Sequence, residues 1–259
     1  MVPNTLFIGQ NSIELPSVDS TNNYVLELLK KNDSLGAERG CVEGTLVWTH
    51  DQTSGRGQRG NTWLSKPLQN LTMSLVLYPQ LPVHLQFYVT KITSLAVAQF
   101  VEQSLEKNIG VSIKWPNDIF VKDQKVAGIL IENSLRGENI NSSVIGIGLN
   151  VNQTDFENGL QNASSLKLIS GKEFKIDTCI KRVCELIEPR YLQLKAGKYE
   201  LLDKDYHAHL HRLNKICNYS SNGESFDAML IGVNESGKLL LKHENEEIKE
   251  YNFKEVAFT

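Results

Sequence analysis

The sequence contains little cysteine, and its four cysteines form no pair at CxxC spacing. This irregular spacing argues against a zinc site or a disulfide framework and favours reduced thiols. No apolar run approaches the roughly 18 residues that a membrane-spanning helix needs. The first residues carry neither the basic nor the apolar segment of a secretion signal. We therefore expect a cytoplasmic protein without membrane attachment.

The sequence also lacks an excess of charge of one sign. Its net charge is −3 and its pI about 6.1, which provides no overall field for holding nucleic acid. The motifs of nucleophile-elbow hydrolases, P-loop nucleotidases and protein kinases are missing as well. Hydrophobic residues make up 41% of the 259 residues, enough for one large domain with or without a small appendix.

What the sequence does contain is a loop rich in glycine and arginine, Gly55-Arg-Gly-Gln-Arg-Gly60, followed closely by Trp63. Glycine lets backbone N–H groups approach a ligand, and arginine offers paired donors to phosphate or carboxylate oxygens. The spacing also fits the dinucleotide-binding fingerprint, which needs a helix after the third glycine. Here an alternating, strand-like segment, 71–78, follows instead. The alternatives are an anion-binding loop of another kind and a plain surface hairpin.

Hydrophobic periodicity divides the chain into helices and strands. Helices are predicted at 24–31, 84–107, 176–195 and 199–209. Strands are predicted near 45–49, 71–78, 111–115, 119–121, 126–132 and 144–152. After Leu213, short strands with Gly or Asn turns follow at 216–219, 226–233, 238–242 and 247–251. This run of short strands predicts a small β-barrel packed on the main domain.

A second polar group of residues is Lys114-Trp-Pro-Asn-Asp118, where Pro116 ends a strand in a defined turn. Asn117 and Asp118 there offer oxygen atoms suited to a sugar hydroxyl or to hydrated Mg²⁺. The predicted hairpin would return Lys125 to the same end of the sheet. The alternatives are a turn whose Asn and Asp bond their own backbone, and a solvated lysine.

Three histidines lie close together at His207, His209 and His211. The spacing invites a metal site, but no accompanying HExxH pattern is present. We interpret the three residues as a solvated helix face.

Taken in order, five motifs of the chain resemble those of the biotin protein ligases, also called biotin–[acetyl-CoA-carboxylase] ligases or holocarboxylase synthetases. The motifs are Ser20-Thr21-Asn22, Gln52 with the Gly55–Trp63 loop, Lys114–Asp118, Lys125-Val-Ala-Gly-Ile-Leu-Ile-Glu132 and Gly146-Ile-Gly-Leu-Asn-Val-Asn152. The tail segment Ile231–Leu241 looks like part of the family's SH3-like domain. The resemblance covers essentially the whole chain, and five ordered motifs are far more specific than any one of them.

The resemblance implies an α+β fold: a class II synthetase-like catalytic domain over residues 1–212, with a mixed sheet and helices on one face, and an SH3-like barrel over 213–259. It implies a two-step reaction with ATP, Mg²⁺ and biotin. Biotin would first become biotinoyl-5′-AMP, and a lysine of a biotin carboxyl carrier domain would then take the biotinoyl group. Adenylation of this kind needs positioned anions and neutralised charge rather than an enzyme nucleophile.

The resemblance also assigns roles to residues. Lys125, Arg56 and Arg59 would be the catalytic residues. Biotin would be bound by Ser20, Thr21, Asn22, Gln52, Gly55, Arg56, Gly57, Lys125 and Gly128, with the first four on its head group. ATP and the adenylate would contact Arg56, Arg59, Gly60, Trp63, Asn117, Asp118, Lys125, Gly148 and Asn150. Asp118 would help hold Mg²⁺, while Gly128 and Gly148 would leave room for ligand.

The sequence departs from the family pattern at Gln58, a position that is often arginine and is linked to retaining the adenylate. The predicted catalytic domain starts almost at Met1, so we expect a ligase without a repressor's DNA-binding module. We also expect the protein to be a monomer or a weak homodimer. Two other functions stay open: a lipoate or octanoate ligase of the same fold, and a non-catalytic biotin or nucleotide sensor.

Overall fold

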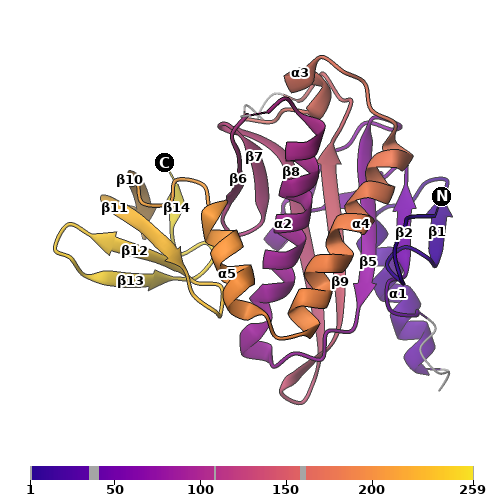
Figure 1. Ribbon diagram of the computed structural model, residues 1–259, viewed down its shortest axis with the longest axis horizontal. Coiled ribbons are helices and arrows are strands. Elements are labelled where there is room, and N and C mark those ends of the chain that lie inside the picture. Colours follow the sequence, from indigo (N-terminus) through magenta and orange to yellow (C-terminus); the bar gives the residue numbers. More distant parts are fainter. Residues whose placement is uncertain (1, 35–40, 108, 158–161, 259) are drawn as a thin grey trace.

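A seven-stranded mixed sheet forms the centre of the molecule in the computed structural model (Figure 1). The structure describes residues 2–34, 41–107, 109–157 and 162–258, with the side chains of 32–34 and 59 outside this description. The strand order is β1 (Ser12–Leu15), β2 (Leu46–Thr49), β5 (Asn70–Leu77), β9 (Asn139–Asn150), β8 (Gln124–Arg136), β7 (Asp118–Val121) and β6 (Val111–Lys114). Only the first pair of strands, β1 and β2, is parallel. The mixed sheet agrees with the expected fold class.

The two faces of this sheet carry different helices. Helices α2 (Phe87–Ser104) and α4 (Ile176–Lys195) cover one face, where they share a large apolar core with Leu46 and Trp48 of β2 (Figure 1). Because successive side chains of a strand point to opposite faces, Val47 between them belongs to a separate cluster under α1 (Thr21–Ser34). Helix α1 therefore lies on the other face of the sheet, whereas the resemblance had implied helices on one face only.

The C-terminal residues form a second, antiparallel sheet of five strands. Its order is β13 (Ile248–Tyr251), β12 (Leu239–His243), β11 (Glu224–Val233), β10 (Ile216–Ser221) and β14 (Ala257–Phe258). This small unit agrees with the expected SH3-like barrel. Helix α5 (Tyr199–Ala208) precedes it, and the predicted domain boundary at 212/213 falls between α5 and β10. That boundary stays a prediction.

The glycine- and arginine-rich segment is a hairpin. Strands β3 (Gly55–Arg56) and β4 (Thr62–Trp63) pair antiparallel around the 3-10 turn η1 (Gln58–Gly60). No α-helix opens at Gly60, so the local structure is not that of a dinucleotide-binding fingerprint. Sequence periodicity also missed β1, β14 and the short helix α3 (Leu166–Ser170), and the predicted helix 84–107 is divided into the 3-10 turn η2 (Val83–Leu85) and α2.

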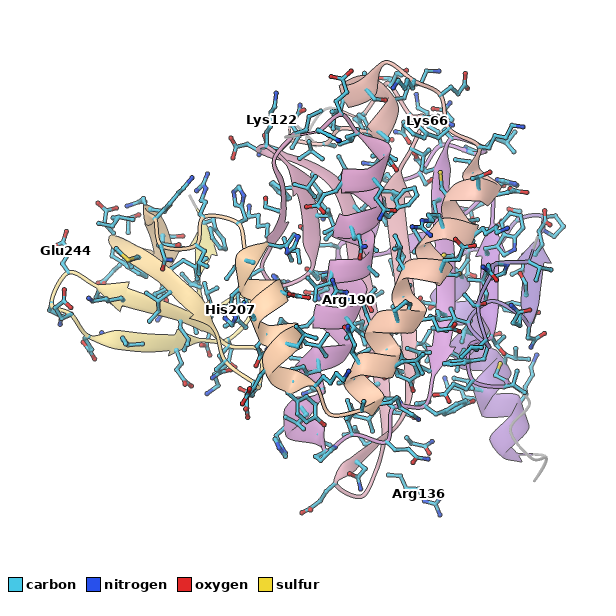
Figure 2. The ribbon with its side chains drawn as sticks, viewed as in Figure 1. Lys66, Lys122, Arg136, Arg190, His207 and Glu244 are labelled. Carbon is cyan, nitrogen blue, oxygen red and sulfur yellow. The ribbon has the colours of Figure 1, made fainter. Side chains whose placement is uncertain are left out.

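The prediction of a solvated histidine face was wrong. His207 bridges α5 to the C-terminal sheet, as its position in Figure 2 indicates: its Nδ1 lies 2.8 Å from the Asp203 carbonyl, and its Nε2 accepts the Val233 N–H at 3.0 Å. His211 lies 2.9 Å from the Ser112 hydroxyl of β6. The histidines are half-buried because the turn after α5 packs between two sheets.

Two absences hold for the described residues. None of their helices is long and apolar enough to cross a membrane. No group of three or more His, Cys, Asp or Glu side chains within them is placed to hold a metal ion.

Candidate active site

A cavity of about 470 Å³ opens on the face of the sheet that carries α1. Its walls come from segments far apart in the sequence: the start of α1, the β3–β4 hairpin, the turn before β7, strands β8 and β9, and residues 253–254 and 256–258. The predicted site residues that line it are Ser20, Thr21, Asn22, Gln52, Arg56, Gly57, Trp63, Asn117, Asp118, Lys125, Gly128 and Gly148. One cavity thus brings together most of the side chains that the motifs singled out.

At one end of the cavity, neutral polar side chains form a hydrogen-bonded chain. Gln52 caps the start of α1 because its Oε1 accepts the Thr21 N–H at 3.0 Å. The Thr21 hydroxyl lies 2.7 Å from the Ser74 hydroxyl, which donates to Asn22 Oδ1 at 2.6 Å. Ser20, Thr21 and Asn22 are each no more than 3% exposed. This end can therefore offer fixed donors and acceptors to a neutral polar ligand, without net charge.

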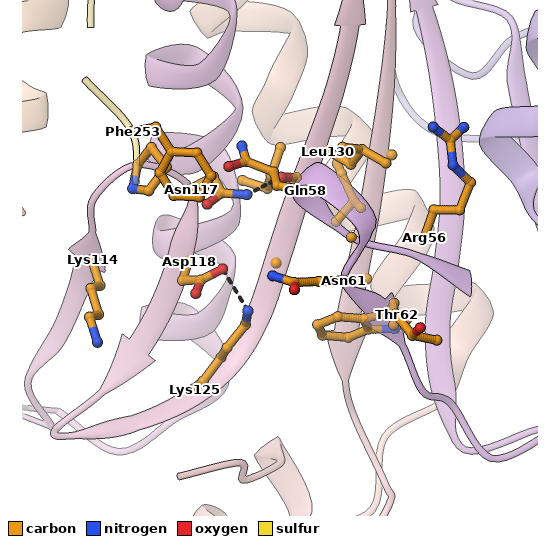
Figure 3. Close-up of a pocket in the computed structure, with 18 of the residues that line it drawn as sticks. Arg56, Gln58, Asn61, Thr62, Lys114, Asn117, Asp118, Lys125, Leu130 and Phe253 are labelled. Carbon is orange, nitrogen blue, oxygen red and sulfur yellow. Dashed lines mark hydrogen bonds and ion pairs between the residues drawn. The ribbon is translucent and has the colours of Figure 1, made fainter. Parts of the chain in front are cut away.

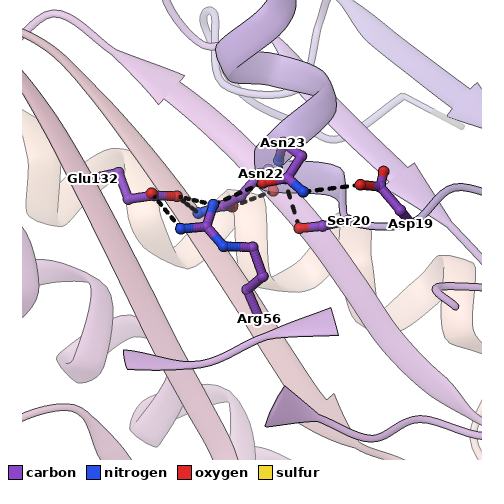
Figure 4. Close-up of polar contacts among 7 residues, drawn as sticks. Asp19, Ser20, Asn22, Asn23, Arg56 and Glu132 are labelled. Atoms are coloured by element: carbon purple, nitrogen blue, oxygen red, sulfur yellow. Dashed lines mark hydrogen bonds and ion pairs between the residues drawn. The ribbon is translucent and has the colours of Figure 1, made fainter. Parts of the chain in front are cut away.

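Asn22 reaches this position only because a glycine lies beneath it on β9. A Cβ atom on Gly146 would stand 2.4 Å from Asn22 Oδ1, far inside contact distance. Asn22 also donates from its Nδ2 to Glu132 on β8 at 2.9 Å (Figure 4). Its amide is therefore held on both sides.

Arg56 of the hairpin is held by the same carboxylate (Figure 4). Its Nη2 and Nη1 donate to the two oxygens of Glu132 at 2.8 and 3.1 Å, and Nη1 also donates to Asn23 at 2.7 Å. Such a two-pronged contact fixes the plane of a guanidinium group as well as its distance. The predicted anion-binding arginine is thus positioned at the rim of the cavity.

Lysines gather at the other end. Lys125 Nζ lies 2.7 Å from Asp118 Oδ1, which confirms that the β7–β8 hairpin returns Lys125 to the turn (Figure 3). Lys114 lies on the same wall with its Nζ over the rings of Phe120 and Phe258. Burial lowers the pKa of Lys114, and the nearby Asp118 partly opposes this effect. These cations suit a ligand that carries negative charge.

Trp63 fills the space beside the two predicted ligand-facing glycines. A Cβ atom on Gly148 would stand 2.3 Å from its indole ring, and one on Gly128 would stand 3.1 Å away. The indole N–H is buried and has no hydrogen-bond partner among the described residues. We had expected Gly128 and Gly148 to leave room for ligand, and here the tryptophan itself occupies that room.

The remaining predicted residues are placed less directly at the cavity. Asn117 lines it, but its amide donates to the Ile129 carbonyl. Asn150 is buried at the end of β9, donates to the Ser164 carbonyl at 2.9 Å and is not part of the cavity lining. Gly55 and Gly60 line a neighbouring cavity across the hairpin. The Arg59 side chain lies outside the described part of the structure.

Known proteins similar to this chain identify its family. The family model of the Biotin/lipoate A/B protein ligase family matches residues 15–150. The bifunctional ligase/repressor BirA of Bacillus spizizenii is 30% identical over 241 residues, which span 92% of this chain and 71% of that protein. The chain belongs to the biotin protein ligase family. The chain is also 33% identical over 129 residues to the biotin–[acetyl-CoA-carboxylase] ligase of Paracoccus denitrificans. This match covers 48% of the chain and 53% of the Paracoccus protein.

A solved structure shares the whole architecture. The biotin protein ligase from Aquifex aeolicus, in complex with biotin and ATP, superposes with a TM-score of 0.74 and 26% identity. The match covers 96% of this chain and 99% of that one, so it includes the C-terminal unit. The predicted fold class is confirmed.

The C-terminal unit of the ligase supplies a wall of the cavity that sequence reasoning missed. Trp115 donates its indole N–H to the Gly237 carbonyl at 2.9 Å and packs edge-on against Phe253. Lys254, Val256 and residues 257–258 complete this wall. Lys254 thereby brings a cation from the C-terminal unit to the cavity. The spacing of short strands alone gave no signal for this placement.

Proposed function

We propose that the chain activates biotin with ATP as biotinoyl-5′-AMP and then transfers the biotinoyl group to a lysine of a biotin carboxyl carrier domain of a carboxylase. The observation that carries the proposal is the division of one cavity into a neutral polar end and a cationic end. Biotin has the matching division, since its ring system is neutral and its chain ends in a carboxylate. The Aquifex relative, described with biotin and ATP bound, supports these substrates.

The neutral end is the proposed place for the ring system of biotin. Ser20, Thr21, Asn22 and Gln52 offer hydroxyl and amide groups of the kind that recognise a cyclic urea. Their mutual hydrogen bonds and burial preorganise them, which lowers the entropy lost on binding. Gly55, Gly57 and Gly128 would allow the backbone to approach the ligand.

The cationic end is the proposed place of the chemistry. A biotin carboxylate oxygen attacks the α-phosphorus of ATP, the new C–O–P link forms, and pyrophosphate leaves with the electron pair of the broken P–O bond. Lys125, Arg56 and Arg59 would neutralise the charge that grows on the phosphate oxygens, as electrostatic catalysis requires. Gly60, Trp63, Asn117, Gly148 and Asn150 would position the nucleotide.

Magnesium would enter with ATP. Mg²⁺ commonly takes one or two protein carboxylates and completes its shell with phosphate oxygens and water. Asp118 would supply that carboxylate, since it lies on the cavity wall next to Lys125. The bound ion would draw charge from the leaving pyrophosphate.

In the second step, the acceptor lysine attacks the acyl carbon as a neutral amine. The C–N bond forms, the C–O bond to phosphate breaks, AMP leaves, and the amine loses one proton. The names of the curated relatives, such as the Paracoccus ligase, support a carboxylase as the acceptor. The free thiols of all four cysteines support a reducing, cytoplasmic location.

Biotin-dependent exchange of labelled pyrophosphate into ATP tests the first step, with lipoate and octanoate alongside. Exchange that biotin alone drives would support the proposal. Exchange driven by lipoate would move the chain to the sibling acyl ligases. If none of the acids drives exchange, the chain would instead be a binding module. Transfer of labelled biotin to an isolated carrier domain tests the second step, with the acceptor Lys→Arg variant of that domain as its control.

A further inference from the structure

The structure places one carboxylate, that of Glu132, between two parts of the cavity that are remote in sequence. Its Oε2 accepts hydrogen bonds from Asn22 at 2.9 Å and from Arg56 Nη1 at 3.1 Å. Its Oε1 accepts a third from Arg56 Nη2 at 2.8 Å. The partners lie 110 and 76 positions away along the chain. Glu132 is therefore the contact that ties the start of α1 to the β3–β4 hairpin.

The geometry fixes the orientation of both partners. Asn22 donates to Glu132 and accepts from Ser74, so a flipped amide would set its oxygen against the carboxylate and its NH₂ against a hydroxyl donor. Arg56 is held by both carboxylate oxygens, and its side chain is still 40% exposed. A long, partly exposed arginine loses much rotamer freedom in such a contact. Without Glu132, the ligand would have to order both groups itself.

We propose that Glu132 is a positioning residue that holds Asn22 and Arg56 in place for the acid substrate, and thereby joins the hairpin to the ring-binding end of the cavity. Glu132 itself lines the neighbouring cavity across the hairpin and is absent from the lining of the main one, so it acts through its partners. This inference rests on the proposed function, because it takes biotin as the acid.

A carboxylate is the side chain that this position needs. Glutamine has a single acceptor oxygen, so it could at best keep the two contacts of Oε2, and its NH₂ group would then face the Arg56 Nη2 donor. Hydrogen bonds to charged groups contribute about 1.5–3 kcal/mol, roughly a ten- to hundredfold change in an equilibrium constant. Glu132→Asp keeps both acceptors but retracts them by one methylene group.

The test measures pyrophosphate exchange against biotin concentration for the wild type, Glu132→Gln and Glu132→Asp. Glu138→Gln is the matched control, since Glu138 is an exposed glutamate in the turn between β8 and β9. We expect the KM for biotin to rise at least about tenfold in Glu132→Gln, and kcat to fall as well, because Arg56 is also proposed to neutralise charge on the reacting phosphate. The KM for biotin of Glu132→Asp should lie between those of the wild type and Glu132→Gln. An unchanged KM for biotin, or an equal change in Glu138→Gln, would overturn the proposal.

Two further measurements separate positioning from general stability and from the proposed function. In an Arg56→Ala background, Glu132→Gln should raise the KM for biotin less than it does in the wild type, and additive effects would count against the proposal. Amide hydrogen exchange of residues 53–57 should be faster in Glu132→Gln than in the wild type, without ligand. This readout stands even if the wild type shows no biotin-dependent exchange, a result that would refute the proposed function alone.

Discussion

The indole ring of Trp63 lies so close to Gly148 that a single methyl group at that glycine would stand 2.3 Å from the ring. Gly148→Ala must therefore displace Trp63 and narrow the cavity. Overpacking of this kind costs about 1–3 kcal/mol, so we expect the affinity for ATP, which Gly148 and Trp63 are proposed to position, to fall at least about fivefold in isothermal titration. Gly110→Ala is the matched control, since its Cβ would meet nothing within 4 Å. Equal binding by the two variants would contradict the packing described here.

Because Trp63 fills the space beside Gly128 and Gly148, we expect its ring to move when ligand binds. Intrinsic fluorescence should change on addition of biotin and then ATP. The chain has three tryptophans: Trp48 is buried in the core, and Trp115, which lines the cavity, is held in place by its hydrogen bond to Gly237. Trp63→Phe should lose most of the change. If the signal persists in that variant, another tryptophan reports binding and Trp63 stays in place.

Lys125→Met removes the proposed charge partner of the phosphate but keeps an apolar stem of similar length. Loss of one stabilising group at a reacting phosphate or acyl centre costs about 10²–10³-fold in rate. We expect a reduction of at least about 100-fold in biotin-dependent pyrophosphate exchange. Lys172→Met, at an exposed lysine outside the cavity, is the control. If the rate of biotin-dependent exchange falls less than threefold, Lys125 is not a catalytic residue.

Lys254 brings a cation from the C-terminal unit to the cavity wall. Its backbone has φ of 72°, a region that asparagine tolerates, so Lys254→Asn removes the charge with little strain. Partly exposed charge contacts contribute up to about 1 kcal/mol, so the KM for ATP should rise about fivefold. The KM for biotin should not change, and Lys249→Asn serves as the control. A rise in the KM for biotin alone would contradict this assignment.

The pKa of His211 is lowered by burial and, to a smaller extent, by the charge of Arg212. The unfolded chain therefore binds a proton more readily than the folded one, so stability falls as the pH drops below about 6.5, the ordinary value for histidine. At pH 7.5 the residue is neutral in both states and makes no such contribution. Accordingly, the drop in melting temperature between pH 7.5 and 5.5 should be smaller in His211→Gln than in the wild type. His84→Gln, at an exposed histidine, should retain the full drop.

Sequence reasoning located the elements well because their signals are local. Helix α4 has the predicted bounds, Ile176–Lys195, since its apolar stripe is long and regular. The Lys125–Asp118 pairing also followed from a short hairpin, where proximity along the chain implies proximity in space.

The contacts that the sequence did not reveal are those between remote segments. Nothing local to Glu132 indicates that it meets Asn22, and nothing local to Trp63 indicates that it lies over Gly148. The histidines were misread for the same reason: their spacing describes one helix face, whereas their environment is set by two sheets that pack around the end of α5. Such contacts depend on tertiary packing, which periodicity does not encode.

The hydrogen bond from Trp115 to Gly237 joins two positions 122 residues apart, and the wall that it anchors is made of residues 253–254 and 256–258. During synthesis these residues leave the ribosome long after the strands and the hairpin that form the rest of the cavity. A nascent chain could therefore fold its central sheet early while the cavity stays open on one side. Substrate would therefore meet a complete cavity only after the C-terminal unit has packed against the central sheet.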